Sequence, residues 1–156
     1  MQTTRDEVIL TVIEPGEQMP EGFGVDDAVR FLGEHLGEYG DSEEAIRAAI
    51  DYALFRPEGP GGLLLLARIA DAPVGLAVVN RTGMSAYIPA NILVYIAVDS
   101  TRRGAGIGRR MVEQVQQICS GGIALHVEYD NPACRLYERL GFTSKYAEMR
   151  YESVKE

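Results

Sequence analysis

Residues 91–119 read NILVYIAVDSTRRGAGIGRRMVEQVQQIC, and this stretch decides the fold. The apolar run Ile92–Val98 has the composition of a buried strand. From Ile107 to Cys119, apolar residues recur at helical spacing. The turn between these two segments contains three glycines, Gly104, Gly106 and Gly108. A strand, a glycine-rich turn and a helix in this order expose consecutive backbone amides at a helix N-terminus, where the helix dipole favours a phosphate group.

The whole chain has the composition of a folded protein. Its 156 residues are 46% apolar and 24% charged, which predicts one domain spanning residues 1–156. The longest apolar runs, near Leu63 and Ile92, are too short to cross a membrane, and the N-terminal residues do not resemble a signal peptide. We therefore expect a soluble, cytoplasmic protein. The two cysteines, Cys119 and Cys134, lack metal-ligand spacing, so neither a disulfide framework nor a metal site is predicted.

Charge is distributed unevenly along the chain. The net charge is −8, with 14 acidic and 4 basic residues in 1–60 but 9 acidic and 11 basic residues in 61–156. Four arginines flank the glycine turn and concentrate positive potential there: Arg102, Arg103, Arg109 and Arg110. An acidic chain without a wider basic patch argues against a nucleic-acid partner.

Outward from the central stretch, the sequence predicts a compact mixed α/β domain whose helices and strands follow in the order βααβββαβαβ. Asp41 is the predicted N-cap of the second helix, with Glu44 three residues on. The predicted strands are 8–13, 63–69, 74–80, 92–98, 123–129 and 142–151, and the predicted helices cover 25–36, 42–54, 107–119 and 132–140.

Two familiar phosphate-binding motifs do not fit the glycine turn. A nucleotide-hydrolase loop needs Lys and then Ser or Thr after its last glycine, whereas Arg109 and Arg110 follow Gly108. The dinucleotide fingerprint needs a glycine where Arg109 stands. A third interpretation, in which the glycines only allow the strand and the helix to approach closely, stays open at this point.

A second motif lies downstream, where residues 131–142 read NPACRLYERLGF. The order of strand, Arg-x-x-Gly-x-Gly, helix, strand, Asn-Pro-Ala, Tyr and Gly-Phe resembles the GNAT N-acetyltransferase superfamily over residues 63–151. The resemblance implies a central, mostly antiparallel twisted sheet of about six strands flanked by four helices. It also implies an enzyme that uses acetyl-coenzyme A as cosubstrate and acetylates a primary amine.

The resemblance assigns residues to the binding of acetyl-CoA. Arg103, Gly106 and Gly108 match the family motif that cradles the pyrophosphate, and the pantetheine arm is expected beside the end of the fourth strand. Asn131 also suits a helix N-cap, with Pro132 at the first helical position, so its place has a purely structural explanation as well. The candidate cofactor-binding residues are Ile96, Ala97, Val98, Arg103, Gly104, Ala105, Gly106, Ile107, Gly108, Arg109, Asn131 and Tyr137.

Tyr137 is the first-choice catalytic residue, because the family tyrosine at this place protonates the departing thiolate. Its helical face, shared with Leu136 and Leu140, is also compatible with a core tyrosine. An ammonium acceptor must lose a proton before it attacks, and strand alternation offers His126 and Glu128 as general bases. Solvated polar side chains on a half-exposed strand are the alternative, and Tyr95 is a weaker candidate base.

The sequence favours direct acyl transfer from acetyl-CoA to a small-molecule or peptide amine. Cys134 has no partner histidine at a readable spacing, which argues against a covalent intermediate. The acidic first third favours a cationic acceptor, although solvated helix faces explain the same residues. A homodimer is compatible with the sequence, and the alternative function is a catalytically silent acyl-CoA-binding regulatory module.

Overall fold

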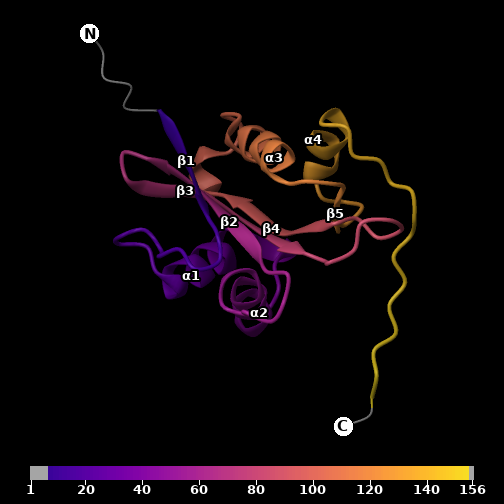
Figure 1. Cartoon of the computed structure of the whole chain (residues 1–156). Helices are drawn as coiled ribbons and strands as arrows, with labels where there is room; N and C mark the ends of the chain where they lie inside the picture. The colour runs from indigo at the N-terminus through magenta and orange to yellow at the C-terminus, as the bar shows by residue number, and fades with distance from the viewer. Residues whose placement is uncertain (1–6, 155–156) are drawn as a thin grey trace.

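A computed structural model describes residues 7–154 of the chain. Its five strands form one sheet in the order β1-β2-β3-β4-β5, with β4 and β5 parallel and the other neighbours antiparallel. Helices α1 and α2 lie on one face of this sheet, and α3 and α4 on the other (Figure 1). The elements are β1 (Val8–Ile13), α1 (Val25–His35), the 3-10 helix η1 (Gly37–Tyr39), α2 (Glu43–Leu54), β2 (Gly62–Ile69), β3 (Ala72–Arg81), β4 (Asn91–Val98), the 3-10 helix η2 (Ser100–Arg102), α3 (Ile107–Ile118), β5 (Ile123–Leu125) and α4 (Ala133–Arg139).

Apolar side chains fill both faces of the sheet, which explains the unbroken apolar run in β2. Leu64 and Leu66 join the core under α1 and α2, whereas Leu63 and Leu65 join the core under α3. All four leucines are fully buried. A strand covered on both faces loses the polar alternation of a half-exposed strand. The mixed α+β class and the mostly antiparallel sheet are confirmed.

The β2–β3 hairpin has a two-residue turn. Ile69 pairs with Ala72, and the two residues between them, Ala70 and Asp71, have φ of 48° and 69°. Two successive positive φ angles are typical of the turn whose twist matches that of the flanking strands. The strand therefore begins at Ala72, two residues before the predicted Val74.

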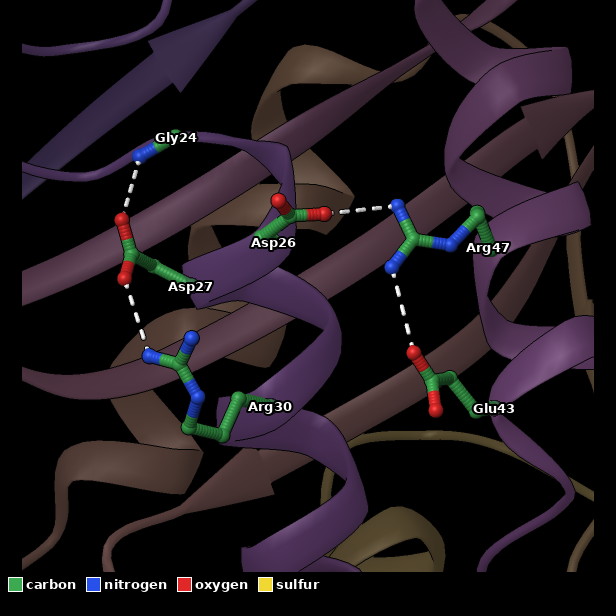
Figure 2. Close-up of polar contacts among 6 residues, drawn as sticks. All are labelled: Gly24, Asp26, Asp27, Arg30, Glu43 and Arg47. Carbon is green, nitrogen blue, oxygen red and sulfur yellow. Dashed lines mark hydrogen bonds and ion pairs between the residues drawn. The ribbon is translucent and has the colours of Figure 1, made fainter.

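The N-terminal halves of α1 and α2 are joined by exposed polar contacts (Figure 2). The Arg47 guanidinium of α2 donates to Asp26 of α1 at 2.9 Å and to Glu43 at 3.2 Å. Asp27 accepts the Gly24 amide at the start of α1 at 2.8 Å. Such exposed pairs contribute little to stability, so they set the geometry of this surface rather than hold the fold together.

The cap of α2 differs from the prediction. The Ser42 hydroxyl, not the Asp41 carboxylate, accepts the Ala45 amide at 3.1 Å, so Ser42 is the N-cap and the prediction of Asp41 was wrong. Asp41 instead accepts the Tyr95 hydroxyl. Within residues 7–154, no helix is both long enough and apolar enough to span a membrane.

Two predictions about the C-terminal third were wrong. The fifth strand ends at Leu125 rather than Tyr129, and residues 142–151 form no strand, so the sheet has five strands instead of six. The residues after Phe142 run in an extended path along one side of the molecule (Figure 1). Alternating side chains do not make a strand without a neighbouring backbone to pair with, and no pairing reaches these residues.

Gly62 gives the largest stability effect that we expect from a single methyl group. A Cβ at Gly62 would lie 1.9 Å from the Val79 carbonyl oxygen, so Gly62→Ala should force the backbones of β2 and β3 apart. We expect it to lower the free energy of unfolding by about 3 kcal/mol or more. Urea denaturation monitored by circular dichroism measures this change.

Gly33→Ala is the matched control, because Gly33 lies within α1 and no atom stands within 4 Å of its added Cβ. It should stabilise the protein by about 0.5–1 kcal/mol, since alanine favours a helix interior over glycine. Equal urea midpoints for Gly62→Ala and the unmodified protein would contradict the pairing of β2 with β3 at this position.

Candidate functional site

The sheet has an opening where β4 continues beyond the end of its parallel neighbour β5. β4 pairs with β5 only from Asn91 to Leu93, although β4 continues to Val98. Within the described residues, the edge of β4 from Val94 to Val98 that faces β5 has no strand partner. Unpaired backbone groups at such an edge can hydrogen-bond an extended ligand as a neighbouring strand would.

Asn91 fixes the closed end of this opening. Its buried side-chain amide donates to the Ser120 carbonyl at 2.8 Å and to the Gly122 carbonyl at 3.1 Å, while its backbone amide also donates to Gly122. These bonds tie the start of β4 to the segment that leads into β5. The two strands are therefore held together where both begin, and β5 ends at Leu125 while β4 continues to Val98.

A β-bulge lies in β4 directly after the residues that pair with β5. Val78 of β3 faces Tyr95 and Val79 faces Leu93, so Val94 is the extra residue. Val94 and Tyr95 both pack toward the core under α1 and α2, whereas neighbouring residues in a regular strand point to opposite faces. The sequence analysis did not predict this bulge, and the bulge turns Tyr95 toward the α1 and α2 face.

The glycine turn at the end of β4 has a conformation that requires glycine. Gly104 and Gly106 have φ of 87° and 82°, and no atom lies within 4 Å of a Cβ built on either residue. Glycine is therefore required at these two positions by the backbone conformation and not by close packing. A Cβ added to Gly108 would make only ordinary van der Waals contacts, 3.6 Å from Val98 and 3.8 Å from Leu136 of α4.

Six consecutive backbone amides of the turn have no acceptor in the part of the chain that the structure describes. Within residues 7–154, the amides of residues 104–109 donate to no protein group, and the first bond of α3 runs from the Arg110 amide to the Gly106 carbonyl at 3.1 Å. Residues 104–106 are exposed. Amides left without an acceptor at a helix N-terminus can donate to an anion such as a phosphate. The turn brings together the predicted residues Gly104, Ala105, Gly106, Ile107, Gly108 and Arg109.

Two of the arginines that flank the turn contact protein partners. Arg103 donates from Nη2 to the His35 carbonyl at 2.6 Å, which joins the turn to the end of α1. Arg109 forms an ion pair with Glu113 one helical turn later, at 3.3 Å. Both guanidinium groups thus contact the chain itself.

Tyr137 lies on α4. The residue before it, Leu136, lies near Gly108 at the N-terminus of α3. The Tyr137 ring packs edge-on against Phe142, with centroids 5.9 Å apart. Burial, and then the nearby Cys134, raise the pKa of Tyr137 to about 12. Within residues 7–154 the Tyr137 hydroxyl has no hydrogen-bond partner. Every fully buried side-chain polar atom in the described residues does have a partner, so the Tyr137 hydroxyl must be accessible to solvent. Such a phenol retains its proton and can give it to a ligand.

The other predicted residues follow the end of β5. His126 and Glu128 are exposed, and because the strand stops at Leu125, the alternation that was used to put them on one strand face does not apply. The Asn131 side chain accepts the Ala133 amide at 2.9 Å and so caps α4. Cys134 donates weakly to the Glu128 carbonyl at 3.4 Å.

Two tyrosines frame the opening on the α1 and α2 side. The Tyr39 hydroxyl donates to the Asp130 carbonyl at 3.3 Å, which connects η1 with the segment before α4. Burial, and then the charges of Asp130, Glu38 and Glu128, raise the pKa of Tyr39. Carboxylates therefore gather on this side of the opening.

Tyr95 lies at the same opening. Its hydroxyl donates to the Asp41 carboxylate at 2.5 Å. Burial, and then the hydrogen bond to Asp41, raise the pKa of Tyr95. Tyr95 therefore keeps its proton, which argues against a role as the general base, for which it was the weaker candidate.

The chain matches one family model and the sequence of one known protein, as follows. A family model described as an acetyltransferase (GNAT) domain matches residues 60–144. An uncharacterized protein of Mycobacterium leprae is 40% identical over 78 residues, which cover 49% of this chain and 21% of that protein. This chain therefore spans about a fifth of the length of that relative.

Solved structures match over nearly the whole chain. A possible acetyltransferase from Clostridium difficile 630 has a TM-score of 0.69 at 18% identity, covering 95% of this chain and 99% of that one. The ribosomal-protein-S18-alanine N-acetyltransferase from Escherichia coli has a TM-score of 0.64 at 19% identity, covering 88% and 80%. An aminoglycoside N-acetyltransferase in complex with CoA has a TM-score of 0.65 at 15% identity, covering 96% of each chain. At these identities the likeness is one of fold.

Proposed function

This chain belongs to the acetyltransferase (GNAT) domain family, and from this premise we propose that it transfers an acetyl group from acetyl-CoA to a primary amine. The observation that carries the proposal is the row of amides at residues 104–109, which donate to no protein group within residues 7–154. Six donors in succession suit the oxygens of a diphosphate, and each bond to an anionic oxygen is strengthened by its charge.

The residues present fit the donor along its length. The amides of Gly104 to Arg109 would hold the diphosphate, and the open edge of β4 at Ile96, Ala97 and Val98 would pair with the pantetheine arm. Asn131 lies at the start of α4 and is proposed to line the same slot. Because β5 ends at Leu125, the edge of β4 beyond Leu93, where this arm would lie, has no strand partner within the described residues.

We assign proton delivery to Tyr137. When bound, acetyl-CoA supplies an activated acetyl group, which passes directly to the amine nitrogen as its carbon–sulfur bond breaks. The Tyr137 hydroxyl holds a proton and has no partner within residues 7–154, so it is available to the departing sulfur. Cys134 is not the proposed nucleophile, because its thiol donates to a backbone carbonyl and no histidine contacts it in the described chain.

The proposed general bases are Glu128 and His126, both exposed beyond the end of β5. Glu128 is the better supported of the two, because its charge acts on Tyr39 at the opening. A carboxylate there can accept the proton that an ammonium acceptor must lose before it attacks.

The acceptor is proposed to be cationic. The charges of Asp130, Glu38 and Glu128 act on Tyr39, and the Asp41 carboxylate contacts Tyr95 on the same side of the opening. Four carboxylates at one mouth raise the local concentration of an approaching cation. A polyamine, an aminoglycoside or a basic peptide end has the required chemistry.

The raised pKa of Tyr137 predicts the shape of the pH profile. Because burial raises this pKa to about 12, the phenol keeps its proton in the range where acceptor amines lose theirs. We expect kcat to increase with pH and to show no fall below pH about 10. Steady-state rates at saturating acetyl-CoA measure the profile. A fall in kcat centred between about pH 7 and 9 would assign proton delivery to a more acidic group instead.

The proposed function is tested by thiol release from acetyl-CoA with a panel of amines. The panel compares polyamines and aminoglycosides with uncharged-tail amines of similar length. We expect release that depends on the amine and is faster for the polycationic members. Tight binding of acetyl-CoA without turnover by any amine would instead support the catalytically silent regulatory module.

A further inference from the structure

His35 is a buried histidine outside the residues assigned to the reaction. It is the last residue of α1 and is 8% exposed. Its ring packs against Phe31 with centroids 4.5 Å apart. A polar side chain this deeply buried needs hydrogen-bond partners, and the partners of His35 lie in the segment that leads into the glycine turn.

Two hydrogen bonds join His35 to that segment. Its Nδ1 accepts the Ser100 amide at 3.1 Å, and its backbone carbonyl accepts Arg103 Nη2 at 2.6 Å. Ser100 is the first residue of the 3-10 helix η2, Arg103 directly follows its last residue, and Gly104 comes next. One residue of α1 therefore holds both ends of the segment from which the glycine turn emerges.

We propose that His35 is a positioning residue that holds the glycine turn in the conformation required to bind the CoA diphosphate. The inference rests on the proposed function, because that function makes the turn a diphosphate site. The turn has few contacts of its own, since residues 104–106 are exposed and their amides donate to no group within residues 7–154. A ligand that had to order this segment would bind more weakly than one that meets it already ordered.

The bond to Ser100 requires one form of the imidazole. Nδ1 accepts only when it carries no proton, so the ring must be neutral with its proton on Nε2. Two charged side chains contact His35: the Glu34 carboxylate lies 3.9 Å from Nε2, and the Arg103 guanidinium contacts the His35 carbonyl. An imidazolium would turn an N–H toward the Ser100 N–H and break the bond.

The experiment compares His35→Ala with His35→Asn by isothermal titration with CoA and by steady-state kinetics. The asparagine oxygen is separated from Cα by the same number of bonds as Nδ1, so it can accept the Ser100 amide. We expect His35→Ala to weaken CoA binding about tenfold and to increase KM for acetyl-CoA equally, with kcat changed less than about twofold. His35→Asn should restore most of the affinity.

Val29→Ala is the control for general loss of stability. Val29 is buried on α1 but contributes no bond to the turn, so this variant should lower the melting temperature without weakening CoA binding. If Val29→Ala weakened CoA binding as much as His35→Ala, a positioning role for His35 would be refuted.

If the unmodified protein fails to bind CoA at all, the proposed function fails with it, whereas equal binding by His35→Ala and the unmodified protein overturns the inference alone.

Discussion

Tyr137→Phe should lower kcat by about 100- to 1,000-fold while leaving KM for acetyl-CoA nearly unchanged. The phenylalanine keeps the ring packed against Phe142 and removes only the hydroxyl that carries the transferable proton. Because that hydroxyl has no partner within residues 7–154, the free energy of unfolding should change by less than about 0.5 kcal/mol. Steady-state thiol release together with urea denaturation separates the two effects.

Tyr129→Phe is the matched control for this substitution. Tyr129 is 92% exposed and stands shortly before α4, so loss of its hydroxyl should leave kcat and stability unaffected. An undiminished kcat in Tyr137→Phe would remove Tyr137 as the acid. A fall in kcat accompanied by a large fall in the free energy of unfolding would show that the hydroxyl acts structurally.

Gly106→Ala should weaken CoA binding by roughly 10- to 100-fold, the equivalent of about 1.5–3 kcal/mol for one lost bond to a charged group. Gly106 is the N-cap of α3 and has φ of 82°, a conformation that alanine adopts only with strain. An alanine that relaxes toward negative φ turns the neighbouring amides away from a common target. Isothermal titration with CoA measures the loss.

Gly22→Ala reproduces the backbone strain away from the site. Gly22 has φ of 81° and, like Gly106, has no atom within 4 Å of an added Cβ. Both variants should lose about 1 kcal/mol of stability, and only Gly106→Ala should lose CoA affinity. If the two variants bound CoA equally well, the amides around Gly106 would not be the diphosphate site.

The sequence predicted those elements whose patterns arise from burial on the chain's own core. The apolar run in β2 and the amphipathic pattern in α3 predicted their ends to within a residue or so, because both segments are covered by the rest of the chain. The glycine turn was also predictable, because glycines between a strand and a helix indicate a helix N-terminus directly.

The features that sequence reasoning missed depend on a partner distant in the chain. The strand expected at 142–151 could form only beside a neighbouring strand, and no strand pairs with these residues. The bulge at Val94 is defined only by the register of β4 against β3. Likewise, a histidine at a helix C-terminus suggests an exposed residue favoured by the helix dipole, and nothing in the sequence near His35 indicates its burial against residues 100–103. Tertiary packing decides all three.

Titration of the protein with CoA and with pantetheine, which lacks the diphosphate, tests the diphosphate site most directly. Six amides that donate to no protein group within residues 7–154 predict that CoA binds at least about 100-fold more tightly than pantetheine and that rising salt narrows the difference. Equal affinities for CoA and pantetheine, or no binding of CoA, would contradict the assignment of the glycine turn.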